Sequence, residues 1–100
     1  MELLTKALLA RFETVGSQES VKDPLVVVKF FNPAGRGSWY ATEYNPEDKM
    51  FFGYVSIFND HNDDWGYFSL AELEEYVGPF GLKIGRDMVF GERRFSEINK

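Results

Sequence analysis

Apolar residues recur along the chain at two spacings, one typical of helices and the other of strands. Near the amino terminus, three of them lie four residues apart: Leu4, Leu8 and Phe12. They share one face of a helix that we predict over residues 5–12, and the hydroxyl of Thr5 can accept a backbone N–H at its start. Residues 15–22 are polar and are followed by Asp23-Pro24, so we expect a loop there.

Four later segments have strand character and are separated by turns: residues 25–31, 38–44, 50–58 and 65–68. The first is apolar on both faces, which predicts a central strand of a sheet. Alternation along the second predicts two sets of side chains on opposite faces: Trp39, Ala41 and Glu43 on one, and Tyr40, Thr42 and Tyr44 on the other. Short turns between consecutive strands predict an antiparallel meander.

A second helix begins after Ser69, because Ser69 and Glu72 have the spacing of a capping box. Its expected buried stripe consists of three apolar residues: Leu70, Leu73 and Val77. The glycine and proline at positions 78 and 79 predict its end.

The remainder of the chain contains one strand-like run at residues 88–90. A charged tail follows over residues 91–100, which we expect to be partly mobile. The predicted fold class is α+β: an antiparallel β-meander of about four strands with a short N-terminal helix and a capped helix after the fourth strand. We expect a single domain over residues 1–100, with an ordered core over about residues 3–90.

Composition excludes several classes of site. Cysteine is absent, which excludes disulfides, thiolate metal sites and cysteine nucleophiles, and the single histidine excludes a site with two imidazoles from one chain. The net charge of −5 disfavours general binding to phosphate backbones. The amino terminus lacks the features of a signal peptide, and no apolar stretch approaches the roughly 20 residues of a membrane span. We therefore expect a cytoplasmic protein that contacts no membrane.

Negative charge is concentrated in the middle of the chain. Between Glu43 and Glu75 there are nine carboxylates and one lysine, which gives this segment a charge of −8. Eight of these residues form a candidate acidic surface for a basic partner: Glu47, Asp48, Asp60, Asp63, Asp64, Glu72, Glu74 and Glu75. The alternative is that they only keep turns and a helix face soluble. Alternate loops of a meander lie at opposite ends of the sheet, so a single continuous face does not follow from the sequence.

The segment Asp60–Asp64 has the opening spacing of a calcium-binding loop. The pattern then fails, because Trp65 occupies the position that needs glycine and Ala71 the position that needs a bidentate glutamate. A hairpin turn is the simpler interpretation. His61 has no nucleophile at a recognisable spacing, so we predict no catalytic residue, no metal site and no cofactor.

A second candidate site lies on the strand that contains Trp39, Tyr40 and Glu43. If its face were concave, aromatic rings and a carboxylate could hold the cationic group of a small ligand. The alternative is that these aromatic residues only stabilise the sheet through cross-strand pairs. Direct binding of nucleic acid is not expected, because the basic residues are scattered along the chain.

Six motifs, taken in order, resemble the bacterial domain-of-unknown-function family numbered twenty-nine fifty-eight. They are Lys22-Asp23-Pro24, Val28-Lys29-Phe30-Phe31, Trp39-Tyr40-Ala41-Thr42-Glu43, Phe51-Phe52-Gly53-Tyr54-Val55, Gly66-Tyr67-Phe68-Ser69-Leu70 and Gly81-Leu82-Lys83-Ile84 with Arg86-Asp87. The sequence departs from the family where Gly85 replaces a common glutamate. The resemblance implies a small bacterial protein, often encoded on plasmids, phages or integrated elements, and it implies no catalytic residue.

Two classes of function follow from these observations. The first is a non-enzymatic interaction protein of a mobile element or phage, which binds a basic protein or a nucleoprotein complex through its acidic residues. In a sharper form, it inhibits a host defence complex by presenting carboxylates in place of phosphates. The second is a small-ligand-binding protein or minor enzyme that uses the strand from Trp39 to Glu43. The scarcity of catalytic groups favours the first.

Overall fold

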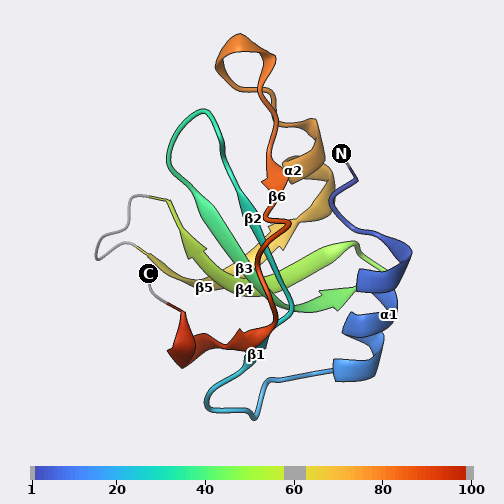
Figure 1. Cartoon of the computed structure of the whole chain (residues 1–100). Helices are drawn as coiled ribbons and strands as arrows, with labels where there is room; N and C mark the ends of the chain where they lie inside the picture. The colour runs from blue at the N-terminus through green and yellow to red at the C-terminus, as the bar shows by residue number, and fades with distance from the viewer. Residues whose placement is uncertain (1, 58–62, 99–100) are drawn as a thin grey trace.

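The computed structural model describes residues 2–57 and 63–98 and shows an α+β fold (Figure 1). The main sheet is antiparallel and has five strands in the order β5-β4-β3-β2-β6, and a second sheet pairs β1 with β7. The strands are β1 (Leu25–Val26), β2 (Val28–Phe31), β3 (Ser38–Asn45), β4 (Met50–Ser56), β5 (Asp64–Ser69), β6 (Gly85–Arg86) and β7 (Arg93–Arg94). The helices are α1 (Lys6–Val15) and α2 (Leu70–Glu75), with 3₁₀ turns η1 (Pro79–Gly81) and η2 (Phe95–Glu97). The predicted four-strand meander is confirmed as β2 to β5.

Both predicted helices form with the predicted caps. The Thr5 hydroxyl accepts from the Leu8 N–H at 3.2 Å, and the Ser69 hydroxyl accepts from the Glu72 N–H at 3.2 Å. The first helix extends past residue 12 to Val15, because Gly16 adopts a φ of 67° and ends it there. The second ends at Glu75, so Val77 lies outside it and is exposed instead of joining the buried stripe.

The segment predicted as one strand over residues 25–31 is two strands. Val26 is buried in one apolar cluster, whereas Val27 and Val28 are both buried in another. Neighbouring residues of a regular strand face opposite sides, so the alternation breaks between Val27 and Val28. The main-chain N–H of Val27 donates to the Ala41 carbonyl at 2.9 Å at this break. The predicted central position is confirmed for β2, which lies between β3 and β6.

The main sheet has a different cover on each face. One face, which we call the helix face, packs with α1 and α2 around Phe30, Phe51 and Phe68. The opposite face, which we call the open face, carries a smaller cluster of Val26, Tyr40 and Ile98, with Tyr54, Phe90 and Phe95 packed against it. No helix in residues 2–57 or 63–98 is long and apolar enough to cross a membrane.

The carboxyl-terminal segment returns to the open face. Phe95 packs on the Tyr54 and Trp65 rings with centroid separations of 4.9 and 4.6 Å, and Ile98 is buried. The sequence placed the end of the core near residue 90, and these contacts lie beyond it. The prediction of a strand at residues 88–90 is wrong, because this segment forms a turn in which Val89 is 92% exposed.

Candidate functional site

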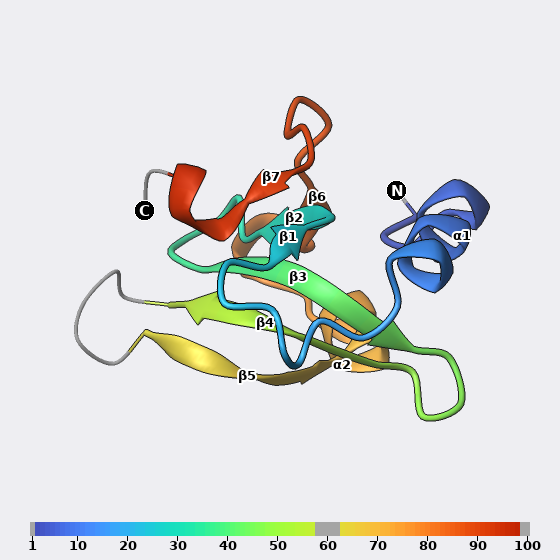
Figure 2. The same cartoon turned by 90° about the horizontal axis from the view of Figure 1, so that it is seen from below.

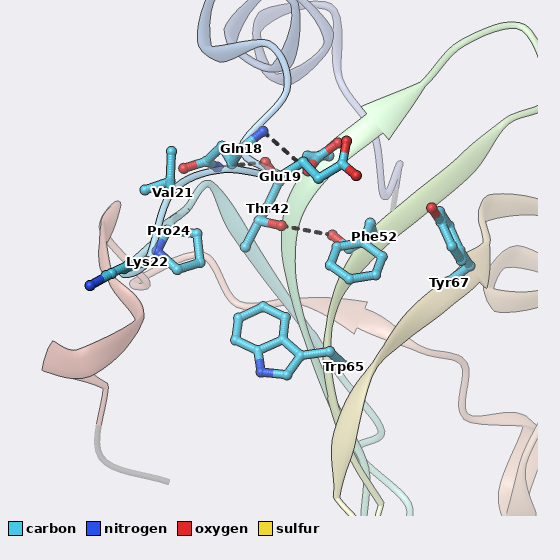
Figure 3. A pocket seen from close by; sticks show the side chains of 10 residues that line it. Gln18, Glu19, Val21, Lys22, Pro24, Thr42, Phe52, Trp65 and Tyr67 are labelled. Carbon is cyan, nitrogen blue, oxygen red and sulfur yellow. Dashed lines mark hydrogen bonds between the residues drawn. The ribbon is translucent and has the colours of Figure 1, made fainter.

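A long loop after α1 covers part of the open face and creates a groove there. Residues 16–24 cross in front of β3 and β4 in Figure 2 before the chain enters β1. The groove between this loop and the sheet has a volume of about 420 Å³. We call it the aromatic groove, and its lining residues are Gln18, Glu19, Val21, Lys22 and Pro24 from the loop and Thr42, Glu43, Phe52, Trp65 and Tyr67 from the sheet (Figure 3).

A β-bulge in β3 determines which side chains face the groove. The register between β3 and β4 shifts between Ala41 and Glu43, so that Thr42 has no direct partner on β4. The side chains of β3 therefore stop alternating between the two faces at the bulge, and Thr42 and Glu43 both line the groove. Glu43 pairs with Phe52 on the open face, and Tyr44 turns to the helix face.

The bulge also explains why the loop is held against the sheet. Its displaced carbonyl, that of Thr42, accepts from the Gln18 side-chain amide at 2.8 Å. The same amide donates to the Leu25 carbonyl at 2.8 Å, and its oxygen accepts from the Leu25 N–H at 2.7 Å. The Thr42 hydroxyl donates to the Phe52 carbonyl at 3.1 Å. Gln18 is thereby fully engaged and only 7% exposed, and it closes the loop onto the bulge.

Aromatic side chains form the wall of the groove opposite the loop (Figure 3). Phe52 stacks on Trp65 with an interplanar angle of 15° and a centroid separation of 6.1 Å, and it meets Tyr67 edge-on at 5.0 Å. Tyr67 is 74% exposed, whereas Phe52 and Trp65 are half-buried. Beyond Trp65 the row continues to Tyr54, at 5.5 Å. These contacts fix the orientation of the rings and leave ring surface open to a ligand.

Glu43 lies where the aromatic groove meets a second hollow. One of its carboxylate oxygens accepts from the main-chain N–H of Gln18 at 3.1 Å, which fixes the side chain. The second hollow has a volume of about 540 Å³ and shares three lining residues with the groove: Glu43, Phe52 and Tyr67. Asp48 also lines the second hollow, and Glu19 and Lys22 line the aromatic groove, so the two hollows together carry three carboxylates and one lysine.

The described residues of the candidate acidic surface divide into two groups. Glu47 and Asp48 precede β4, which begins at Met50. Met50 pairs with Ser69, and α2 begins directly after Ser69. Glu47, Asp48 and the glutamates of α2 therefore lie at the same end of the sheet. Burial, together with the neighbouring carboxylates of Glu74 and Asp48, raises the pKa of Tyr44 at this end.

Asp63 and Asp64 lie at the opposite end. The Ser56 hydroxyl at the end of β4 donates to Asp63 at 2.8 Å. Burial, followed by the charges of Asp63 and Asp64, raises the pKa of Tyr54 there. Asp60 and His61 lie outside the described residues, so the hairpin turn and the metal candidate are not placed. Within the described part of the chain, no three acidic or histidine side chains gather as metal ligands.

The structure does not bring Trp39, Tyr40 and Glu43 together. Trp39 lies on the helix face, Tyr40 is buried in the open-face cluster, and the bulge places Glu43 in the aromatic groove. Glu43 therefore lines the aromatic groove, whereas Trp39 lines a separate hollow on the helix face. The expectation that Trp39 and Glu43 share a face is wrong, because it assumed uninterrupted alternation.

Sequence reasoning missed most of the groove. Gln18 lies in a loop of ordinary polar composition and gives no local signal of its role. Trp65 and Tyr67 alternate along β5 opposite Tyr54 and Phe52, so they could have been found once the register between β4 and β5 was assumed.

Comparison with known proteins adds a family assignment. The model of the family described as "Protein of unknown function (DUF2958)" matches residues 2–98. The chain belongs to the DUF2958 family. The match covers nearly the whole chain of this DUF2958 member, including the loop, the bulge and the three strands that form the aromatic groove. Comparisons with the curated proteins and with the solved structures found no significant match.

Proposed function

We propose that this DUF2958 member is a non-enzymatic interaction protein that binds a basic segment of a partner protein along the aromatic groove. The observation that supports this is the position of Glu43, which joins two continuous hollows and lies beside the Phe52 and Tyr67 rings. A lysine or arginine side chain placed there meets a carboxylate and aromatic surface together.

The physical basis is a preorganised site for positive charge. Glu43 is held by the Gln18 N–H, and the aromatic rings are held by each other, so little ordering is required on binding. A cation over an exposed aromatic ring gains about 0.5–1 kcal/mol. A charged hydrogen bond to Glu43 contributes roughly 1.5–3 kcal/mol. An extended peptide that makes several such contacts reaches useful affinity without a deep pocket.

The surrounding charge supports a basic partner. Glu47, Asp48 and the α2 glutamates lie at the same end as the second hollow and add a negative field that accelerates association. The partner that fits is a basic protein, or the protein part of a nucleoprotein complex, in the bacterial cytoplasm. We prefer this to nucleic-acid mimicry, because the described residues of the candidate acidic surface divide between two ends of the sheet and do not form one row.

The test is binding of fluorescently labelled peptides rich in lysine and arginine, measured by anisotropy at low and at high salt. Tyr67→Ala is expected to weaken binding about twofold to fivefold, and Glu43→Gln about tenfold. Glu13→Gln is the matched control, because Glu13 is exposed on α1, away from the groove lining. Equal affinity in the wild type, Tyr67→Ala and Glu43→Gln would refute the assignment of the groove.

A second comparison distinguishes binding by the groove from binding by the glutamates of α2. Charge reversal of Glu72, Glu74 and Glu75 together is expected to slow association and to reduce its salt dependence, and to change the dissociation rate of the bound peptide little. If this triple variant abolished binding while Glu43→Gln preserved it, the acidic helix would be the binding surface and the groove would not.

A small cationic ligand is the alternative occupant. The groove volume of about 420 Å³ lies within the range of roughly 300–1,000 Å³ found for small-molecule sites. Thermal shifts with small guanidinium and quaternary ammonium compounds test this reading. A shift that disappears in Glu43→Gln, without any peptide binding, would favour the small ligand over the partner protein.

A further inference from the structure

A turn after α2 projects from the body of the protein and exposes apolar side chains. The orange segment at the top of Figure 1 rises beyond both the sheet and α2. We call residues 77–82 the plug; Phe80 at its tip is 99% exposed, and Val77 and Leu82 are also exposed. Exposed apolar residues gathered on one projection indicate a contact surface.

The plug is a defined structure and not a loose connection. The Gly78 N–H donates to the Leu82 carbonyl at 2.7 Å, and the Leu82 N–H donates to the Pro79 carbonyl at 3.2 Å. Phe80 adopts a φ of 61°, a left-handed conformation that bulky residues rarely occupy. A strained, fully exposed phenylalanine at the tip of a closed turn is typical of a residue placed for contact.

An apolar hollow lies at the base of the plug, on the α2 side of the sheet. Its volume is about 310 Å³. Its apolar lining is Trp39, Ile57, Phe68, Leu73, Tyr76 and Ile84, and its polar lining is Asn32, Arg36, Ser69 and Glu72. A cavity of roughly 150 Å³ suffices for benzene. The hollow therefore has room for a phenylalanine ring together with part of a neighbouring side chain. The plug does not fill the hollow of its own chain, because Phe80 is almost fully exposed and is not among the residues that line the hollow.

The segment around the plug and the α2 side of the hollow carry opposite charge. Arg36 and Glu72 both line the hollow, and α2 adds Glu74 and Glu75 with no basic residue. Residues 76–84 carry Lys83 and no acidic residue. The lysine that follows the plug of one molecule is therefore complementary to the acidic α2 of a second molecule.

We propose that the chain forms a twofold-symmetric dimer in which Phe80 of each copy enters the hollow of the other. A twofold interface uses the same patch on both subunits, and this patch contains both a plug and a hollow. In this arrangement Lys83 of one copy lies against the α2 glutamates of its partner. The aromatic groove is on the opposite face of the sheet, so the dimer leaves it open, and this inference is independent of the peptide-binding function.

A lipid surface is a poorer fit for the same residues. The other exposed apolar tip, at Met88 and Val89, lies between β6 and β7 and projects at the top of Figure 2, in a different direction from the plug in Figure 1. A flat membrane would therefore not meet both tips. The glutamates of α2 beside the plug would also be repelled by anionic lipid.

The experiment is sedimentation velocity over a concentration series. The wild type is expected to shift from monomer to dimer, and Phe80→Ala is expected to raise the dissociation constant at least tenfold. Phe80→Gly, which suits the positive φ, separates loss of the ring from backbone strain and is expected to weaken the dimer equally. Val89→Ala is the matched control, because it removes an equally exposed apolar side chain elsewhere and is expected to leave the dimer unchanged.

Charge exchange tests the orientation of the two copies. Lys83→Glu and Glu72→Lys are each expected to weaken the dimer, and the double variant is expected to recover affinity. A wild type that stays monomeric into the millimolar range would overturn the proposal, and so would a Phe80→Ala variant that dimerises normally. Peptide binding by Phe80→Ala, expected to be normal, shows whether a failure belongs to the dimer or to the groove.

Discussion

Replacement of Gln18 by alanine tests how the loop, the bulge and the groove depend on each other. The side-chain amide makes three hydrogen bonds of 2.7 to 2.8 Å, two with the backbone of Leu25 and one with the carbonyl of Thr42. Each is worth about 1 kcal/mol net, and a buried group left without a partner costs roughly 1–3 kcal/mol. Gln18→Ala is therefore expected to lower the free energy of unfolding by about 2–4 kcal/mol.

The assay is urea unfolding followed by circular dichroism, with Gln18→Glu as a second variant. The glutamate keeps an acceptor for the Leu25 N–H but places an oxygen against the two carbonyls that the amide satisfies. Its expected loss is at least as large as that of the alanine. Glu19→Ala, at the exposed neighbouring position, is the control. A loss below about 1 kcal/mol for Gln18→Ala, or full stability in Gln18→Glu, would refute the reasoning.

Two further substitutions test other features of the fold. Gly53→Ala would place a Cβ 2.0 Å from the backbone oxygen of Tyr40. We expect this clash to lower the free energy of unfolding, measured with urea, by about 3 kcal/mol or more, or to prevent folding. Hydrogen bonds from the Ser96 hydroxyl and N–H lower the pKa of Asp23 below its ordinary 3.8. Stabilisation by this contact is therefore present above that pH and is lost as the pH falls further. Asp23→Asn should be less stable than the wild type at neutral pH, with a difference that shrinks in acid; a difference that is constant with pH, as expected for Glu13→Gln, would contradict this assignment.

The helix caps and the meander could be predicted because their causes are local. A hydroxyl before an apolar stripe needs only the next turn of chain to make its hydrogen bond, and Thr5 and Ser69 both do so. Strands joined by short turns pair with their neighbours for the same reason. The order β2 to β5 follows from chain connectivity alone.

The remaining features depend on contacts between distant parts of the chain. The break after Val26 arises because β1 pairs with β7, about seventy residues later, while β2 pairs with β3. The role of Gln18 exists only because a bulge displaces the Thr42 carbonyl toward it. In both cases, the residues around one partner give no indication in the sequence of what the other partner is. The predicted site places Trp39 and Tyr40 beside Glu43, whereas the aromatic residues that line the groove with Glu43 are Phe52, Trp65 and Tyr67.

The extra residue in β3 has a consequence for how the chain can vary. Deletion of Thr42 would remove the bulge and restore regular alternation, which would still place Glu43 on the open face and Tyr44 in the core, 4.7 Å from Phe51. The core would therefore keep its ring. The deletion would instead remove the Thr42 carbonyl that the Gln18 amide binds, and with it one of the contacts that hold the loop against the sheet. The bulge is thus a requirement of the groove and not of the hydrophobic core.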